Sequence, residues 1–285
     1  MAAGMTNAST ALSEAPLAIS RRMPFFGLVE GVGRRVRSAV EALGHASRFV
    51  VDTLRAFADV HTWAPSATMH MRRLGVDSLP IGVFIAVFTG IVLSLLASYS
   101  FTGAVPLYFV GTLVEKTITM ELAPVLTGLA LAGRVGANIA AELGTMRVTE
   151  QIDALETLSY DPYAYLVVPR VLAGTVMFPV VVGAAMLTGV ASGWIASISL
   201  LDLSSADFAQ GLRLFFSDFD VRYGLVKSAS FGFVVTVIGS IRGLRAQGGA
   251  EGVGRAATTA VVYSAVMILV LDAFWAVAWL LGTER

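Results

Sequence analysis

The chain has 285 residues, of which 56% are apolar and only 14% charged, and its formal net charge is zero. A soluble domain carries about 25% charged residues to cover its surface, so this composition excludes a soluble globule and favours lipid as the solvent. The zero net charge gives no reason to expect nucleic acid as a partner. The absence of cysteine excludes disulfides, thiolate metal sites and cysteine nucleophiles, and the three histidines all precede the first long apolar run.

The N-terminal part is predicted to lie outside the membrane core. Residues 1–45 mix Ser, Ala and Gly with several Arg and are predicted to be a mobile cytoplasmic extension. Residues 46–76 are predicted to form an amphipathic helix in the membrane interface, although a cytoplasmic helix packed on its own protein is the alternative. The polar face of this predicted helix consists of Arg48, Asp52, Arg55 and Asp59.

Residues 77–285 are predicted to form an all-α membrane domain with five transmembrane helices. About 20 apolar residues, at a rise of 1.5 Å each, cross a hydrocarbon core of about 30 Å. Five stretches approach this length, and the small-residue spacings within them permit close contact between helices. The expected spans are Leu79–Phe101, Thr117–Gly133, Val171–Leu201, Ser228–Ile241 with a few preceding residues, and Ala256–Gly282.

The distribution of Lys and Arg predicts the orientation. With five spans, the segments 1–78, 134–170 and 242–255 share one side of the membrane and carry fifteen basic residues. The opposite side carries five, counting Lys227 with the outer loop. Since basic residues accumulate on the cytoplasmic side, the N-terminus is expected in the cytoplasm and the C-terminus outside.

The segment 134–160 is too polar to lie in lipid and is predicted to form a cytoplasmic helix pair between two spans. It also has an apolar side, which includes Ile139, Leu143 and Leu155 and needs cover. A polar segment with an apolar side is more typical of an element that contacts a partner protein than of a loop surrounded by water. The charged residues available for such a contact are Glu142, Arg147, Glu150 and Asp153.

Three blocks of this sequence resemble the MlaE/YrbE family, the permease subunits of ABC-type lipid transporters. The first is AGRVGANIAAELGTMRVTEQIDALETLSYDP, from Ala132 to Pro162, and it is followed by VPR at Val168–Arg170. The second runs from Lys227 to Val262, and the third is LDAF at Leu271–Phe274. The blocks occur in the family's order, and the resemblance covers about residues 48–282.

The resemblance implies a homodimer of five-helix permeases in a bacterial cytoplasmic membrane. It implies that the 134–160 region couples to a separate ABC ATPase subunit and that an MCE-domain lipid-binding protein lies on the outer side. It also places Tyr99 and Glu121 near a lipid cavity, where Leu96 and Leu122 would supply the apolar wall. No nucleotide-binding loop of the form GxxxxGK[ST] occurs in the chain, which agrees with ATP hydrolysis elsewhere.

Two acids lie inside expected spans, where a charge at mid-bilayer costs about 2.5–3.5 kcal/mol. For Asp272, a structural hydrogen bond to another helix is the favoured interpretation. For Glu121, an interfacial position and a place at the lipid cavity are equally open.

The sequence therefore predicts a permease subunit of an ATP-driven transporter that moves phospholipid or related lipids between the cytoplasmic membrane and the outer envelope. No catalytic residue, metal or cofactor is expected in it. A membrane-embedded lipid-modifying enzyme is the first alternative, weakened by the missing nucleophiles and by the separation of Glu121 from Asp272 in sequence. A proton-coupled secondary carrier is the second, weakened because no internal repeat is visible.

Overall fold

The computed structural model describes residues 24–101, 105–201 and 203–283, and all regular elements in these ranges are helices. Five segments in them are long and apolar enough to cross a membrane. The predicted all-α fold with five spans is therefore confirmed. These segments are Val60–Ser100, Phe109–Val148, Tyr163–Leu200, Asp218–Leu244 and Gly249–Trp279.

The helices follow one another with short connections, and several abut without a loop. Three single π-helical turns are built into longer helices, at Ile118–Leu122, Ala132–Gly136 and Tyr163–Val167. The α-helices are α1 (Pro24–Ala56), α2 (Val60–Leu74), α3 (Leu79–Ser100), α4 (Phe109–Thr117), α5 (Ala123–Leu131), α6 (Ala137–Val148), α7 (Gln151–Thr157), α8 (Val168–Leu200), α9 (Ser205–Leu214), α10 (Asp218–Leu244) and α11 (Gly249–Thr283).

The chain divides into two units, Met1–Arg48 and Phe49–Arg285, and α1 runs from the first into the second. Part of the predicted extension is thus helical, from Pro24 onward, and the helix predicted over 46–76 consists of the end of α1 followed by α2. The break between them falls beside Asp59, whose carboxylate accepts a hydrogen bond of 2.6 Å from the Thr62 hydroxyl. Residues 1–23 lie outside the described part, and their mobility stays a prediction.

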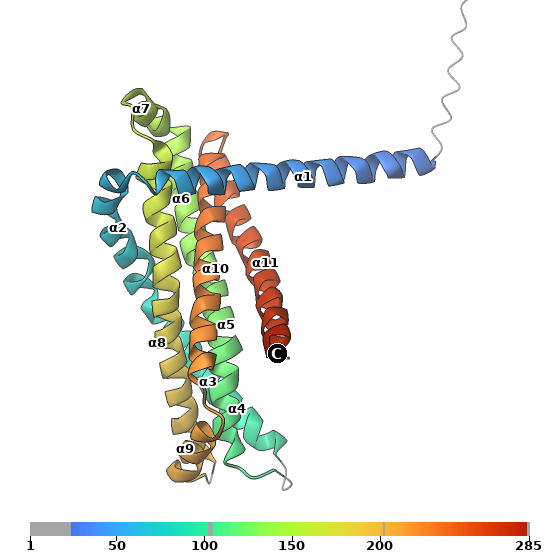
Figure 1. Ribbon diagram of the computed structural model, residues 1–285, viewed down its shortest axis with the longest axis vertical. Coiled ribbons are helices and arrows are strands. Elements are labelled where there is room, and N and C mark those ends of the chain that lie inside the picture. The colour runs from blue at the N-terminus through green and yellow to red at the C-terminus, as the bar shows by residue number, and fades with distance from the viewer. Residues whose placement is uncertain (1–23, 102–104, 202, 284–285) are drawn as a thin grey trace, which may run out of the picture. The chain divides into compact units, whose positions relative to one another are not determined.

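In the second unit, α8 packs against both α3 and α10 (Figure 1). The α3–α8 contact is close because small residues face each other: a Cβ added to Gly90 would lie 2.1 Å from the Gly189 carbonyl oxygen. Polar side chains fasten the same seam, since Ser192 donates to the Val87 carbonyl at 3.0 Å. Backbone proximity of this kind is how membrane helices associate without a hydrophobic driving force between them.

The second span differs from the prediction. The span was expected to end at Arg134 and a separate cytoplasmic helix pair to follow it, but one helical segment runs from Phe109 to Val148. Arg134 fits because its guanidinium donates hydrogen bonds to the Asp77 carbonyl and, at 2.6 Å, to the Ser78 hydroxyl. A charged side chain with polar partners does not end a helix, so the polar segment begins as a helical continuation and turns only after Val148.

The fourth span also differs, because α10 begins at Asp218, well before the expected Ser228. Lys227 therefore lies inside the helix and is fully buried, and counting it with the outer loop was wrong. Without Lys227, the basic residues divide fifteen against four, so the argument for the orientation is unchanged.

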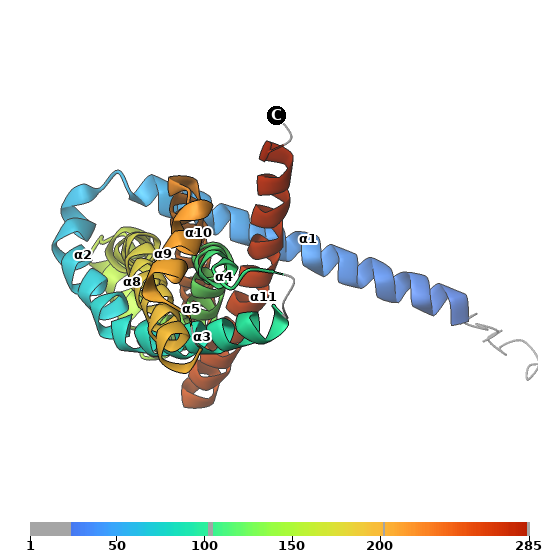
Figure 2. The same cartoon turned by 90° about the horizontal axis from the view of Figure 1, so that it is seen from below.

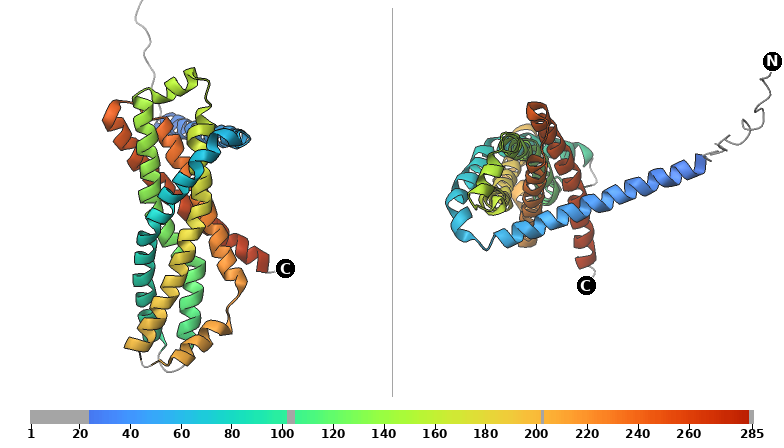
Figure 3. Two further views of the ribbon diagram at one scale, coloured as in Figure 1. Left: turned by 90° about the vertical axis from the view of Figure 1, so that its left-hand side faces the viewer. Right: turned by 90° about the horizontal axis from the view of Figure 1, so that it is seen from above.

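The last helix, α11, crosses the bundle obliquely, and its C-terminal half leans away from the other spans (Figures 2 and 3). Only 17% of its most apolar window is buried, against 56% for α10. Much of α11, and the outward side of α3, is thus apolar surface that the described residues leave uncovered. The largest exposed apolar side chains on the two helices are Phe84, Phe88, Val92, Leu96 and Tyr99 of α3 and Val262, Val266, Val270, Phe274 and Val277 of α11.

Candidate functional site

A charged cluster lies inside the bundle and is centred on Lys227. The Lys227 ammonium is 2.7 Å from a carboxylate oxygen of Glu121 and 2.5 Å from one of Asp272. It also donates a hydrogen bond of 3.3 Å to the Met120 carbonyl. Three spans are joined at this point, because the lysine belongs to α10, Asp272 to α11 and Glu121 to the π-helical turn between α4 and α5.

The local backbone explains how the lysine reaches its partners. A π-helical turn widens the helix and frees carbonyl groups from the regular bonding pattern, and such turns are frequent at functional sites. The turn Ile118–Leu122 presents the Met120 carbonyl in this way. One turn before Lys227, Gly224 lets α10 approach, since a Cβ there would lie 2.3 Å from the Thr119 carbonyl oxygen.

The cluster has one ammonium for two carboxylates. Lys227 has no exposed surface, whereas the side chains of Glu121 and Asp272 are 43% and 25% exposed. A buried lysine needs partners of this kind because an unpaired charge in an apolar interior is strongly disfavoured. The excess negative charge therefore lies on the open side of the cluster, where it can meet water or a polar group of a bound molecule.

The contacts of Asp272 and Glu121 go beyond what their positions in sequence indicated. Asp272 contacts another helix, as the structural interpretation required, and it does so through an ion pair with Lys227. Glu121 meets the same ammonium, so the two acids that appeared isolated from each other share a partner. Lys227 was not among the predicted site residues. The sequence did contain a signal for it, because the stretch Ser228–Ile241 was too short to cross the membrane without the residues before it, and these include Lys227.

The other residues predicted for the lipid cavity do not enclose a space within the single chain. Leu122 lies against α3, where it lines a small cavity with Thr89. Leu96 follows Thr89 by about two helical turns along α3, and it is 58% exposed. Tyr99, one turn further, is 82% exposed. Since Leu96 and Tyr99 are exposed and the Glu121 side chain is 43% exposed, a closed cavity at these residues needs a second surface.

The predicted coupling residues separate into two groups. Glu142 points inward, at 3.1 Å from the Arg73 guanidinium and 3.3 Å from that of Arg170. Arg170 is 4% exposed, so its charge depends on this carboxylate. Because Arg73 belongs to α2 and Arg170 to α8, Glu142 holds three helices together at this end of the bundle.

The other three residues form the corner between α6 and α7. Arg147 and Asp153 make an ion pair of 2.6 Å across it, and both side chains remain about half exposed. Glu150 turns the chain with a φ of +60°, which is uncommon for a residue other than glycine. Beside this corner is a depression of about 300 Å³ that Gly248 and Gly249 also line. In Figure 1 the corner lies at the end of the bundle opposite α9.

The described residues contain no group of three His, Cys, Asp or Glu side chains that could hold a metal ion. Lys227, Glu121 and Asp272 form ion pairs with one another and are not placed as a nucleophile with its base. The chemistry this arrangement offers is electrostatic: a charged, partly open centre between spans, and a polar corner at one end.

Comparison with known proteins identifies relatives over most of the chain. A sequence model of the family described as "Permease MlaE" matches residues 67–278. A "Probable ABC transporter permease protein" of Rickettsia conorii is 38% identical over 86% of this chain and 95% of its own length. One of the same description from Synechocystis is 41% identical over 74% and 80%. The "Intermembrane phospholipid transport system permease protein MlaE" of Haemophilus influenzae is 30% identical over 86% and 94%.

Proposed function

This chain belongs to the MlaE permease family, and we propose that it is the membrane subunit of an ABC transporter that moves phospholipid or a related lipid across the envelope. The match over residues 67–278 is the observation that carries the proposal. The names of the relatives support it, because two are described as ABC transporter permeases and one as part of an intermembrane phospholipid transport system. Five apolar spans suit a multi-pass protein of the cytoplasmic membrane.

As a permease, the chain is a transport component and not an enzyme. ATP hydrolysis belongs, in this proposal, to a separate ATPase subunit. That subunit would dock at the corner between α6 and α7, which offers the exposed Arg147, Glu150 and Asp153 beside a depression. Glu142 stands behind this corner and would position α6 against α2 and α8.

A second permease copy would cover the open faces of α3 and α11. Their exposed apolar side chains have no cover from the described part of the chain, and the side chain of Glu121 is 43% exposed. Between two copies, Leu96, Tyr99, Glu121 and Leu122 would border a lipid cavity. Tyr99 offers an apolar ring with a hydroxyl at its tip, which suits the boundary between acyl chain and head group.

The orientation and the outer partner complete the proposal. The excess of Lys and Arg places the N-terminus and the α6–α7 corner in the cytoplasm. The end of the bundle that carries α9 then faces outward and is available to an MCE-domain protein. This partner is expected from the family resemblance.

Photo-crosslinking tests the cavity. Photoreactive residues at positions 99 and 122 should capture phospholipid in membranes, and one at Val180 serves as the control because it is exposed on α8, outside the proposed cavity. Glu121→Ala should lower lipid transport more than it lowers the amount of inserted protein. Capture at both test positions no greater than at Val180 would contradict the cavity.

A further inference from the structure

An apolar groove of about 670 Å³ opens on the side of the bundle between α4, α8 and α9. It is distinct in its residues from the Lys227 cluster and from the proposed cavity between two copies. Its apolar walls are built mainly by Met186, Leu187, Val190, Phe208, Leu212 and Phe216.

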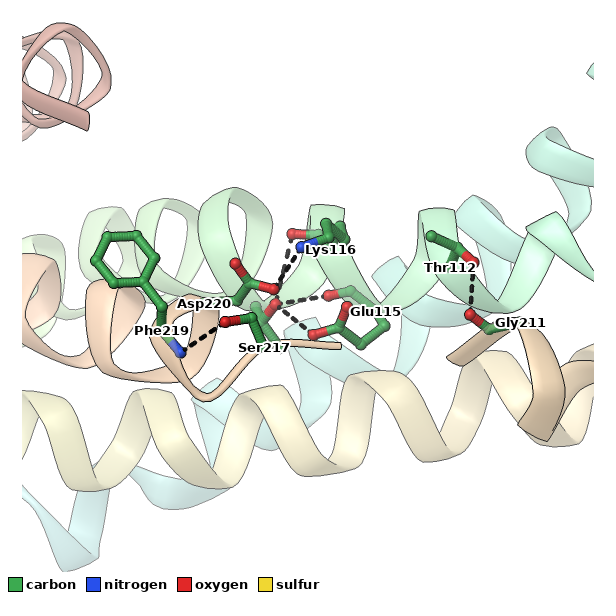
Figure 4. Close-up of polar contacts among 8 residues, drawn as sticks. Thr112, Glu115, Lys116, Gly211, Ser217, Phe219 and Asp220 are labelled. Atoms are coloured by element: carbon green, nitrogen blue, oxygen red, sulfur yellow. Dashed lines mark hydrogen bonds and ion pairs between the residues drawn. The ribbon is translucent and has the colours of Figure 1, made fainter. Parts of the chain in front are cut away.

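The groove exists because α9 packs mainly against α4 and makes fewer contacts with α8. Gly211 of α9 touches the end of the second span so closely that a Cβ on it would lie 1.7 Å from the Tyr108 carbonyl oxygen. Thr112 donates a hydrogen bond of 2.5 Å to the Gly211 carbonyl, as Figure 4 shows. The side of α9 that carries Ala209 and Leu212 faces α8, and the groove lies between these two helices.

One polar side chain inside the groove has a free hydrogen-bonding site. Glu115 is 2% exposed, and one of its carboxyl oxygens has no hydrogen-bond partner among the described residues. Its other oxygen accepts a bond of 3.2 Å from the Thr119 hydroxyl. Neighbouring Lys116 does not bond to it, and its ammonium lies 2.5 Å from the Asp220 carboxylate (Figure 4). A buried polar atom left without a partner indicates a bound group that supplies one.

The rim of the groove carries the opposite charge. Arg213, in the last turn of α9, is exposed and lines the groove, and it makes no ion pair within the described part of the chain. Trp194, whose indole N–H is 3.3 Å from the Ser205 hydroxyl at the start of α9, also lines the groove. Tryptophan and arginine beside an apolar surface are typical of the level of lipid head groups.

We propose that this groove binds one phospholipid of the surrounding bilayer, with an acyl chain between α8 and α9 and the phosphate at Arg213. Glu115 then faces the hydroxyl or ammonium group of the same lipid. The volume lies in the range of about 300–1,000 Å³ that ligand sites occupy. A partner's transmembrane helix fits less well, since a helix of about 10 Å diameter fills roughly 1,200 Å³ for every ten residues.

The first test uses the chain in membranes of cells that also make its natural partners. A photoreactive residue at position 187 or 212 should capture phospholipid, identified by mass spectrometry of the adduct. The control is again Val180, which is exposed on α8 outside the groove. Capture at 187 and 212 no greater than at 180 overturns the proposal, and so does capture of a protein in place of lipid.

The second test fills the groove without disturbing the core. Ala209→Trp places a large ring in the groove, whereas Ala206→Trp, three residues earlier on α9, points to solvent and is the matched control. Lipid capture at position 187 should fall about tenfold in Ala209→Trp, the factor that about 1.4 kcal/mol of lost binding produces. It should not change in Ala206→Trp. Equal capture in the two variants overturns the proposal.

The third test concerns the head group. Arg213→Glu should lower capture of anionic phospholipid in vesicles containing phosphatidylglycerol and phosphatidylethanolamine. Arg222→Glu is the control, because Arg222 is exposed and pairs with Asp218 outside the groove. An equal effect of both variants would mean a general surface charge effect and would reject the site at Arg213.

These outcomes are separable from those of the proposed function. Crosslinkers at positions 99 and 122 report on the cavity between two copies, while those at 187 and 212 report on the groove. Lipid captured at positions 187 and 212 but not at 99 and 122 would contradict the proposed cavity and support the groove. The reverse result would contradict only the groove.

Discussion

The Lys227 cluster makes a strong prediction about the stability of the bundle. Replacing Lys227 by Met keeps most of the apolar stem of the side chain but removes the positive charge that pairs with Glu121 and Asp272. At an effective dielectric constant of 20, each contact of 2.5–2.7 Å corresponds to roughly 6 kcal/mol of attraction before desolvation. Removing one partner of a buried pair costs about 3–5 kcal/mol in net terms.

The exposure of the two acids sets the expected value within that range. Since the side chains of Glu121 and Asp272 are 43% and 25% exposed, neither carboxylate is enclosed by the protein as a fully buried ion is. We therefore expect Lys227→Met to lower the free energy of unfolding by about 3 kcal/mol, the lower end of the range. Asp272→Asn leaves the pair between Lys227 and Glu121 intact and should cost only about 1 kcal/mol, the value of a single hydrogen bond.

The assay is reversible unfolding of the protein in lipid bicelles, followed by fluorescence. The triple variant Lys227→Met, Glu121→Gln, Asp272→Asn should recover much of the loss, because it leaves no unpaired charge. Arg222→Met is the control, since it removes an exposed ion pair worth less than about 1 kcal/mol. Equal and small effects of Lys227→Met and Asp272→Asn would refute the view that the lysine neutralises both acids.

Three further predictions concern topology, coupling and packing. A reporter at the C-terminus should be active outside the cytoplasm and one inserted at Gly249 inside, and the same side for both would contradict the orientation. Arg147→Glu should lower lipid-stimulated ATP hydrolysis of the whole complex. The exchange Arg147→Asp with Asp153→Arg serves as the control, because it restores the ion pair between α6 and α7. Full recovery of ATP hydrolysis in this double variant would exclude direct docking through Arg147. Gly90→Ala should lower stability by about 1–3 kcal/mol through overpacking, whereas Gly254→Ala, which has open space around its Cβ, should not.

The number and approximate positions of the spans could be predicted because hydrophobic length is a property of each segment alone. The errors occurred where a charged residue was taken as the end of a span. Arg134 and Lys227 both lie inside long helices, because each finds polar partners on a different helix. Such partners are tertiary contacts between segments more than fifty residues apart, and no local pattern contains them.

The side-chain contacts of the candidate site could not be predicted for the same reason, because they join distant segments of the chain. The family resemblance pointed to Glu121 and the 134–160 region, but not to the contacts that their side chains make. Glu142 illustrates this, since its neighbours in sequence indicate a contact with another protein, while its carboxylate pairs with Arg73 and with the buried Arg170 of the same chain. The groove beneath α9 was missed entirely, because its apolar residues are what any membrane helix contains.

The placement of charge explains how one bundle can be both stable in lipid and able to change shape. The inner charges are concentrated at two levels: Lys227 with its two acids joins three spans, and Glu142 with its two arginines joins α2, α6 and α8. The α3–α8 seam depends on glycine packing, which is rigid because the backbones touch. The same packing joins α8 to α10, since a Cβ added to Gly232 would lie 2.3 Å from the Gly174 carbonyl oxygen. A charged group with two partners can lose one and keep the other, whereas helices joined by glycines cannot slide without a clash. Movement driven from the α6–α7 corner is therefore expected to pass through α11, with α3, α8 and α10 moving as one body.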